Sequence, residues 1–103
     1  MIARTWQGWA PSATADDYQR HYETEVTEHL QRIAGFRGAR LLRRQRGDEV
    51  AFTSITFFAS MDDVHAFAGT NPDNAVVQDT ARRVLSRWDH HVAHHEVAFD
   101  IQP

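Results

Sequence analysis

The segment EVAFTSITFFAS carries large apolar side chains on both faces of a predicted β-strand. Successive side chains of a strand point to opposite faces, and an apolar face has to be covered by another part of the protein. In a chain of 103 residues, which points to one domain, this requirement limits how the remaining elements can be arranged. The two sets are Val50, Phe52 and Phe58 on one face, and Ile55 and Phe57 on the other.

Turn residues and helical periodicity divide the rest of the sequence into strands and helices. Apolar residues at three- to four-residue spacing predict a long helix that is capped by Thr14 and ends at Gly35. Gly47 and Asp48 are typical of a tight turn between two strands. The predicted elements are strands 1–9, 36–45, 49–60 and 90–101 and helices 15–34, 61–69 and 73–87.

This order of elements, β-α-β-β-α-β, predicts an α+β, ferredoxin-like fold that spans residues 1–103 as a single domain. The four strands form an antiparallel sheet, and the helices cover one of its faces. The second apolar face of strand 49–60 then needs another partner. We expect a second copy of the chain to pack sheet against sheet, which gives a homodimer with two-fold symmetry and a dimeric α+β barrel.

Composition argues against several kinds of partner. The formal net charge of −3 disfavours nucleic acid. The absence of cysteine rules out disulfides, thiol nucleophiles and thiolate metal sites. No apolar run approaches the roughly 20 residues that a membrane span needs, and the first residues lack a signal-peptide pattern. We therefore expect no membrane partner and a cytoplasmic location.

Four of the seven histidines lie in the stretch WDHHVAHHEVAF, residues 88–99. On a strand, histidines four residues apart are separated by roughly 13 Å, so they cannot bind one metal ion, and we predict no metal site. His94 and Glu96 share a face, and in a pocket they would form a general base near neutral pH. The alternative is that His94 has a structural role in a half-polar wall.

Other candidates lie on the first strand and the first helix. Arg4 shares a face with Trp6, and inside a pocket it would hold a carboxylate, a phenolate or an enolate; at an interface it would pair with an acid. His21 is four residues before Glu25, so the two are neighbours on the helix surface. His21 or Tyr22 would then line the mouth of the pocket, whereas the alternative is a solvated helix flank.

Three motifs carry a resemblance to a known family. The segments GFRGARLLRR, FTSITFFASMDDVHAFAG and VAHHEV resemble those of the antibiotic biosynthesis monooxygenase-like family of dimeric α+β barrels. The resemblance implies the fold derived above. It also implies a place among cofactor-independent oxygenases of polyketide chemistry, quinol oxygenases and haem-degrading enzymes. The late histidine of the family aligns with His94.

Two positions depart from the family pattern. The polyketide oxygenases carry a tryptophan at the end of the third strand and an asparagine four residues earlier, and here these positions are Phe58 and Ser54. The haem degraders share that tryptophan, an N-terminal asparagine and a haem-ligating histidine on the later helix. Here the first strand carries Arg4 and Trp6, and helix 73–87 contains no histidine. The residues therefore argue against haem binding.

The resulting hypothesis is a cofactor-independent monooxygenase that acts on a small aromatic or polyketide-type metabolite in an apolar pocket between sheet and helices. A cofactor-free cyclase or isomerase and a non-catalytic ligand-binding protein are the alternatives. No cofactor is expected. The candidate catalytic residues are His94 and His21, and the candidate substrate-binding residues are Arg4, Trp6, Tyr22, Phe58, Phe67 and Trp88.

Overall fold

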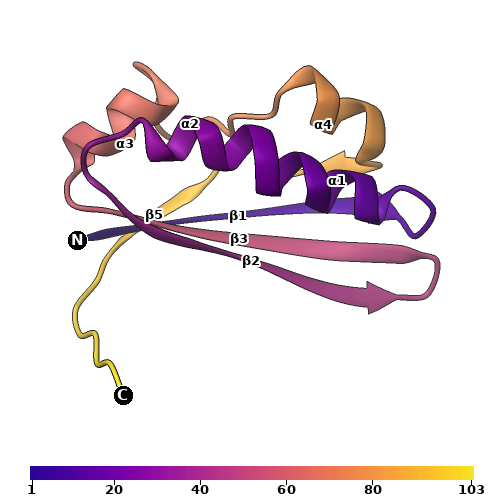
Figure 1. Cartoon of the computed structure of the whole chain (residues 1–103), viewed down its shortest axis with the longest axis horizontal. Coiled ribbons are helices and arrows are strands. Elements are labelled where there is room, and N and C mark those ends of the chain that lie inside the picture. Colours follow the sequence, from indigo (N-terminus) through magenta and orange to yellow (C-terminus); the bar gives the residue numbers. More distant parts are fainter.

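The computed structural model describes all 103 residues and has two layers, with the helices on one face of an antiparallel sheet (Figure 1). The long first helix packs along the strands, and the C-terminal tail leaves the sheet on the side away from the helices. The elements are β1 (Ile2–Pro11), α1 (Ala15–His21), η1 (Tyr22–Val26), α2 (Thr27–Gln31), β2 (Phe36–Arg46), β3 (Glu49–Phe58), α3 (Met61–Ala68), α4 (Asp79–Val84), β4 (Arg87–Trp88) and β5 (Ala93–Glu96).

The strand order is β2-β3-β1-β4, and β5 also pairs with β1, all antiparallel. This arrangement confirms the predicted ferredoxin-like α+β fold. Of the strand predicted over residues 90–101, only β5 forms. The short β4 pairs with β1 ahead of the predicted strand, and residues 89–92 between them leave the ladder. A bridge between Asn74 and His91 occupies this break and ties a preceding loop to it.

The alternation along β3 confirms the two-sided strand. Val50, Phe52 and Phe58 are fully buried under the helices, whereas Ile55 and Phe57 on the opposite face are only half-buried. Leu42, which lies on the same open face, is 49% exposed. One face of the sheet is thus covered within the chain, and the other presents apolar side chains to the outside.

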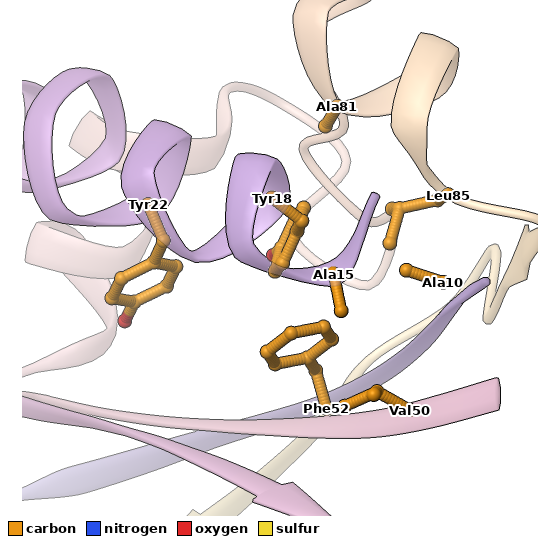
Figure 2. Close-up of a cluster of buried hydrophobic side chains, with 8 residues drawn as sticks. All are labelled: Ala10, Ala15, Tyr18, Tyr22, Val50, Phe52, Ala81 and Leu85. Atoms are coloured by element: carbon orange, nitrogen blue, oxygen red, sulfur yellow. The ribbon is translucent and has the colours of Figure 1, made fainter. Parts of the chain in front are cut away.

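The core consists of two clusters under the helices. The larger one joins the first helix to β1, β3 and the end of α4 (Figure 2). The smaller one contains Leu30, Phe58 and Val64 at the other end of the sheet. The members of the larger cluster are Ala10, Ala15, Tyr18, Tyr22, Val50, Phe52, Ala81 and Leu85.

The first helix begins at Ala15 as predicted, but it ends at Gln31, three residues before the predicted end, and one turn is π-helical. Tyr22–Val26 forms η1 between α1 and α2. The hydroxyl of Thr27 donates to the carbonyl of Tyr22 at 2.9 Å and supports the widened turn. Thr14 is the N-cap residue as predicted, but its side chain does not cap the helix, because its hydroxyl donates to the carbonyl of Val84 at 2.8 Å.

The helix predicted over residues 73–87 is wrong in its first half. Only Asp79–Val84 is helical, and Trp88 belongs to β4. The carbonyls of Pro72 and Asn74 accept hydrogen bonds from the side chain of Arg4. In a helix these carbonyls would instead accept hydrogen bonds from backbone N–H groups four residues later. Tertiary contacts to the first strand thus hold residues 70–78, defined here as the roof loop, in an irregular path.

No helix of the chain combines the length and the apolar character that crossing a membrane requires.

Candidate functional site

A small, mostly apolar chamber lies between the sheet, the first helix and the roof loop. Its volume is about 50 Å³, and seven of its ten lining residues are hydrophobic. Strands, loops and the first helix all contribute to the wall, so the chamber exists only in the folded chain. The lining residues are Arg4, Trp6, Tyr18, Tyr22, Val26, Ser54, Thr56, Phe67, Val76 and Val92.

Arg4 is the only charged residue on the wall of this chamber, and it is 5% exposed. Burial lowers the pKa of its guanidinium to about 10, which Asp73 partly opposes, so the group is a cation at neutral pH. No carboxylate lies within ion-pair distance of it. A buried cation without an anionic partner is unfavourable, and it is a natural place for an anionic group of a ligand.

The guanidinium of Arg4 is held by neutral acceptors from the roof loop. One nitrogen donates to the carbonyl of Pro72, and Nη2 donates to the carbonyl of Asn74 at 2.9 Å. The ring of Phe67 lies 5.7 Å from the guanidinium carbon. These contacts fix the orientation of the cation and leave its charge without a counter-ion.

His94 completes the polar corner of the chamber. Its Nε2 lies 2.9 Å from Nη1 of Arg4, and an arginine can only donate, so Nε2 is the acceptor and the ring is neutral. The proton then sits on Nδ1, which faces Oδ1 of Asp73 at 3.4 Å. Burial and the charge of Arg4 lower the pKa of His94, against the opposing effect of Asp73. A neutral imidazole with a directed lone pair is the form that acts as a base.

The register of β5 against β1 brings these two side chains together. Arg4 pairs with His94, and Thr5 pairs with Ala93. His95 consequently lies on the opposite face, where its Nε2 is 3.4 Å from the hydroxyl of Thr5. The predicted division of the histidines between two faces is therefore confirmed.

Aromatic rings form the other walls. The indole of Trp6 donates from Nε1 to the carbonyl of Asp89 at 2.8 Å, which fixes its ring beside that of Tyr18 at 6.3 Å between centroids. Burial raises the pKa of the Tyr18 phenol, with a smaller contribution from Tyr22, so its hydroxyl is protonated at neutral pH. The chamber is thus suited to a flat apolar ring with a single negative oxygen.

Of the eight predicted site residues, four lie on the chamber wall, namely Arg4, Trp6, Tyr22 and Phe67. His94 touches the chamber through Arg4. His21 is buried on the helix, with Nδ1 2.9 Å from Oε2 of Glu25, and is not among the lining residues. The solvated flank that was the alternative for His21 is wrong, since its side chain is 2% exposed.

The other two predicted residues lie elsewhere. Phe58 is fully buried with Leu30 and Val64 in the smaller core cluster. Trp88 packs against the larger cluster, with the guanidinium of Arg82 at 5.8 Å from its ring centroid. Neither is among the residues that line the chamber. The functional roles expected for all eight residues remain predictions.

Sequence reasoning missed several residues of the site. Thr56 lies on the face of β3 that also carries Phe52 and Phe58, so strand alternation was a usable signal for it. The roof residues Asp73 and Val76 carried no such signal, because the segment was expected to be a helix. No group of three or more histidine, aspartate or glutamate side chains is arranged to hold a metal ion.

No protein-family model matches the sequence, and no curated protein matches it. Solved structures do match over the whole chain. A mutant of MhuD with two manganese protoporphyrin IX bound per active site has a TM-score of 0.72 at 19% identity, and the match covers 100% of both chains. The monooxygenase from the gene ActVA-Orf6 of Streptomyces coelicolor in complex with nanaomycin D has a TM-score of 0.67 at 13% identity, with 99% of this chain and 91% of that chain covered.

A third match is SnoaB, a cofactor-independent oxygenase from Streptomyces nogalater, with a TM-score of 0.55 and 14% identity. It covers 99% of this chain and 97% of that one. At such low identity these likenesses establish the fold. They confirm, at the level of the fold, the resemblance to antibiotic biosynthesis monooxygenases.

Proposed function

We propose that the protein is a cofactor-independent monooxygenase that oxidises a small aromatic, polyketide-type metabolite. The observation that carries this proposal is the pair Arg4 and His94. Arg4 is a buried cation without a carboxylate on the wall of an apolar chamber, and it contacts the neutral ring of His94 behind that wall. The fold shared with a cofactor-independent oxygenase and with a monooxygenase that binds nanaomycin D supports the same class of reaction.

The geometry suggests how the two side chains cooperate. An oxyanion is a stronger acceptor for a guanidinium than a neutral carbonyl or imidazole. A ligand that places a phenolic oxygen beside Arg4 therefore competes for Nη1, which now contacts Nε2 of His94. Once Nε2 is released, its lone pair is free to take the phenolic proton, and Arg4 stabilises the phenolate.

The oxidation then needs only the bound phenolate and dioxygen. The electron-rich ring transfers one electron to dioxygen, and the two radicals combine at a ring carbon that bears hydrogen to give a peroxide. Loss of water from the peroxide, with the carbon-bound proton and the proton held by His94 returned to oxygen, leaves a quinone. One phenol and one dioxygen thus give one quinone and one water. The apolar walls exclude bulk water from the intermediates.

A neighbour of the same fold binds manganese protoporphyrin IX, and the residues of this chain do not fit haem. His94 is the histidine that contacts the guanidinium of Arg4, and both of its nitrogens are engaged, Nε2 with Arg4 and Nδ1 towards Asp73. No step of the proposed reaction therefore passes through haem.

The proposed active form is a homodimer in which two sheets face each other. Support comes from the half-buried Ile55 and Phe57 and the exposed Leu42 on the open face of the sheet. Phe99 and Ile101, 79% and 75% exposed, extend this apolar surface along the C-terminal tail. Light scattering coupled to gel filtration at micromolar concentration tests this, and a stable monomer would contradict it. A cytoplasmic location remains a prediction from the sequence.

The test of the reaction is oxygen uptake with an anthrone or a naphthol as substrate, in wild type and two matched variants. His94→Gln should abolish turnover, whereas His95→Gln, the adjacent histidine on the other face, should retain it. Labelled dioxygen should leave one labelled oxygen in the quinone. Product without label would favour a cyclase or isomerase, and tight binding without product would favour a binding protein. Full activity in His94→Gln would exclude His94 as the base.

A further inference from the structure

The chamber is too small for the ligand that its chemistry suits. It measures about 50 Å³, whereas pockets that bind drug-sized ligands occupy about 300–1,000 Å³. One of its walls must therefore move when a fused aromatic ring binds, and the contacts of each wall indicate which one.

The roof loop is the firmly held wall. Arg4 donates to two of its carbonyls, those of Pro72 and Asn74. Its backbone is also tied to the β4–β5 connection, through Ala75 N–H to the carbonyl of His90 at 2.9 Å and Val92 N–H to the carbonyl of Asp73 at 2.8 Å. Hydrogen bonds from a charged donor contribute about 1.5–3 kcal/mol each. Lifting the roof would break several of them at once.

The wall formed by Tyr22 is held by much less. Its only side-chain hydrogen bond is a long contact of 3.4 Å between its hydroxyl and Oγ of Ser54. In Figure 2 the side chain hangs from the first helix towards the strands, at the end of the cluster and away from the closely packed Tyr18 and Phe52. Turning it aside leaves the aromatic pair of Tyr18 and Phe52, at 4.8 Å between centroids, in place.

The backbone beneath Tyr22 is secured independently of that ring. Tyr22 opens the π-helical turn η1, and π-turns of this kind are frequent at functional sites. The carbonyl of Tyr22 accepts from the hydroxyl of Thr27 at 2.9 Å. The side chain can therefore change rotamer while the helix stays intact.

A second hollow adjoins the chamber on the far side of Tyr22. It is an open groove of about 460 Å³ between the first helix and β2, and we call it the helix–β2 groove. Tyr22 lines both spaces, so its ring is the partition between them. The groove lies on the helix side of the sheet, away from the face that the proposed dimer covers. Its lining residues are Gln19, Tyr22, Glu23, Thr27, Leu41, Arg43 and Phe52.

The groove combines an apolar floor with a polar rim. Leu41 is the partly exposed apolar residue of the floor, and Phe52 lies fully buried beneath Arg43. Arg43 is fixed on the rim, because its Nη1 donates to Asp16 at 2.9 Å and to Gln19 at 2.6 Å while its guanidinium lies 5.5 Å from the centroid of Phe52. A flat ring with hydroxyl or carbonyl substituents on its outer edge matches this surface.

We propose that the ligand is an elongated, fused-ring aromatic with an acidic oxygen at one end, and that it binds across the Tyr22 partition. Its oxyanion end lies in the chamber at Arg4, Tyr22 turns aside, and the distal rings lie in the helix–β2 groove. The inference rests on the proposed function for the oxyanion end of the site. It adds the direction in which the ligand extends, the residue that gates it and the surface that selects its length.

Three acids of increasing length test the proposal, namely benzoate, 2-naphthoate and anthracene-2-carboxylate, titrated by calorimetry. In the wild type the affinity should rise with the number of rings. Leu41→Trp fills the groove and should weaken anthracene-2-carboxylate at least tenfold while changing benzoate less than twofold. Glu23→Trp, at an exposed rim position, should have the same selective effect, and it serves if Leu41→Trp does not fold. The comparison is Val76→Trp on the chamber wall in the roof loop, which should weaken all three acids alike and so leave the ratio of their affinities unchanged.

The outcomes separate this inference from the proposed function. If Val76→Trp weakens the longest acid selectively and neither groove variant does, the ligand extends under the roof loop and the inference is wrong. If the acids bind in an Arg4-dependent manner but ignore both groove variants, the proposed oxyanion site stands and the inference alone fails. If the wild type binds none of them saturably, or if Arg4→Met binds them all unchanged, both fail.

Discussion

The indole of Trp6 lies directly against the backbone of Gly8, so a methyl group at position 8 would come within 2.5 Å of its Cη2. The contact explains how a half-buried tryptophan is kept at one edge of the chamber. Because Gly8 has no side chain, the indole ring can lie against its backbone. The hydrogen bond from Nε1 to the carbonyl of Asp89 holds the ring in this position. A residue outside the chamber thus sets the shape of the chamber.

Gly8→Ala should therefore displace the ring of Trp6. Overpacking of this kind costs about 1–3 kcal/mol of folding free energy, and we expect a loss in that range by urea unfolding. The near-ultraviolet circular dichroism of the tryptophans should change, and the affinity for 2-naphthoate should fall. Gln7→Ala, at the exposed neighbouring position, is the control and should behave as the wild type. An unchanged near-ultraviolet spectrum in Gly8→Ala would refute the close contact.

Arg4→Met should loosen the roof loop. The substitution removes the donors to the carbonyls of Pro72 and Asn74, each worth about 1.5–3 kcal/mol. The N–H of Ala75 donates to the carbonyl of His90, and the N–H of Val92 donates to the carbonyl of Asp73. We expect hydrogen exchange at these two amides to accelerate at least tenfold. Arg40→Met, which removes an exposed arginine from the open side of β2, provides the comparison. Equal protection in both variants would show that the backbone bridges alone hold the roof.

His94 should make stability depend on pH in a defined direction. Its pKa in the folded protein is lowered by burial and by Arg4, whereas an unfolded histidine titrates near about 6.5. The unfolded chain therefore takes up the proton first as the pH falls. The stabilisation is complete above about 6.5 and is lost as the pH falls towards the lower folded pKa.

The free energy of unfolding should consequently fall more steeply between pH 7 and pH 5 in the wild type than in His94→Gln. Urea titrations at several pH values measure the two slopes. His95→Gln, which lies on the opposite face, should keep the wild-type slope. Parallel slopes for the wild type and His94→Gln would contradict the lowered pKa.

Phe58 should prove to be a core residue. It is fully buried between Leu30 and Val64, and deleting a buried aromatic ring costs about 3–5 kcal/mol. Phe58→Ala should lose stability in that range, and Phe58→Leu, which keeps most of the volume, should lose much less. Acid binding by Phe58→Leu should match that of the wild type. A stable Phe58→Ala that no longer binds aromatic acids would instead make Phe58 a ligand contact.

Hemin should not bind specifically. His94 has both nitrogens engaged, Nε2 with Arg4 and Nδ1 towards Asp73. In a titration followed at the Soret band, we expect no saturable shift with one hemin per subunit. A saturable shift that His94→Ala abolishes would overturn this expectation and make the histidine an axial ligand.

Local periodicity in the sequence was enough to predict most of the fold. Alternation along residues 49–58 predicted which side chains of β3 face the helices, because successive side chains of a strand must point to opposite faces. The same rule predicted that His94 and His95 lie on opposite faces of their strand, as they do. The first helix followed from its apolar spacing, although the π-helical turn at Tyr22 left no trace in that pattern.

Tertiary structure alone decided the site. The pairing of Arg4 with His94, 90 positions later, depends on the register between β1 and β5, and no local signal specifies that register. The same arginine takes the carbonyls of Pro72 and Asn74 and prevents the helix that local spacing favours there. The sequence by itself therefore determined which residue types face the core. Long-range contacts determined which of these residues meet in one chamber. A buried charge such as that of Arg4 needs hydrogen-bond partners, and this need outweighs the local helix preference of the segment that supplies them.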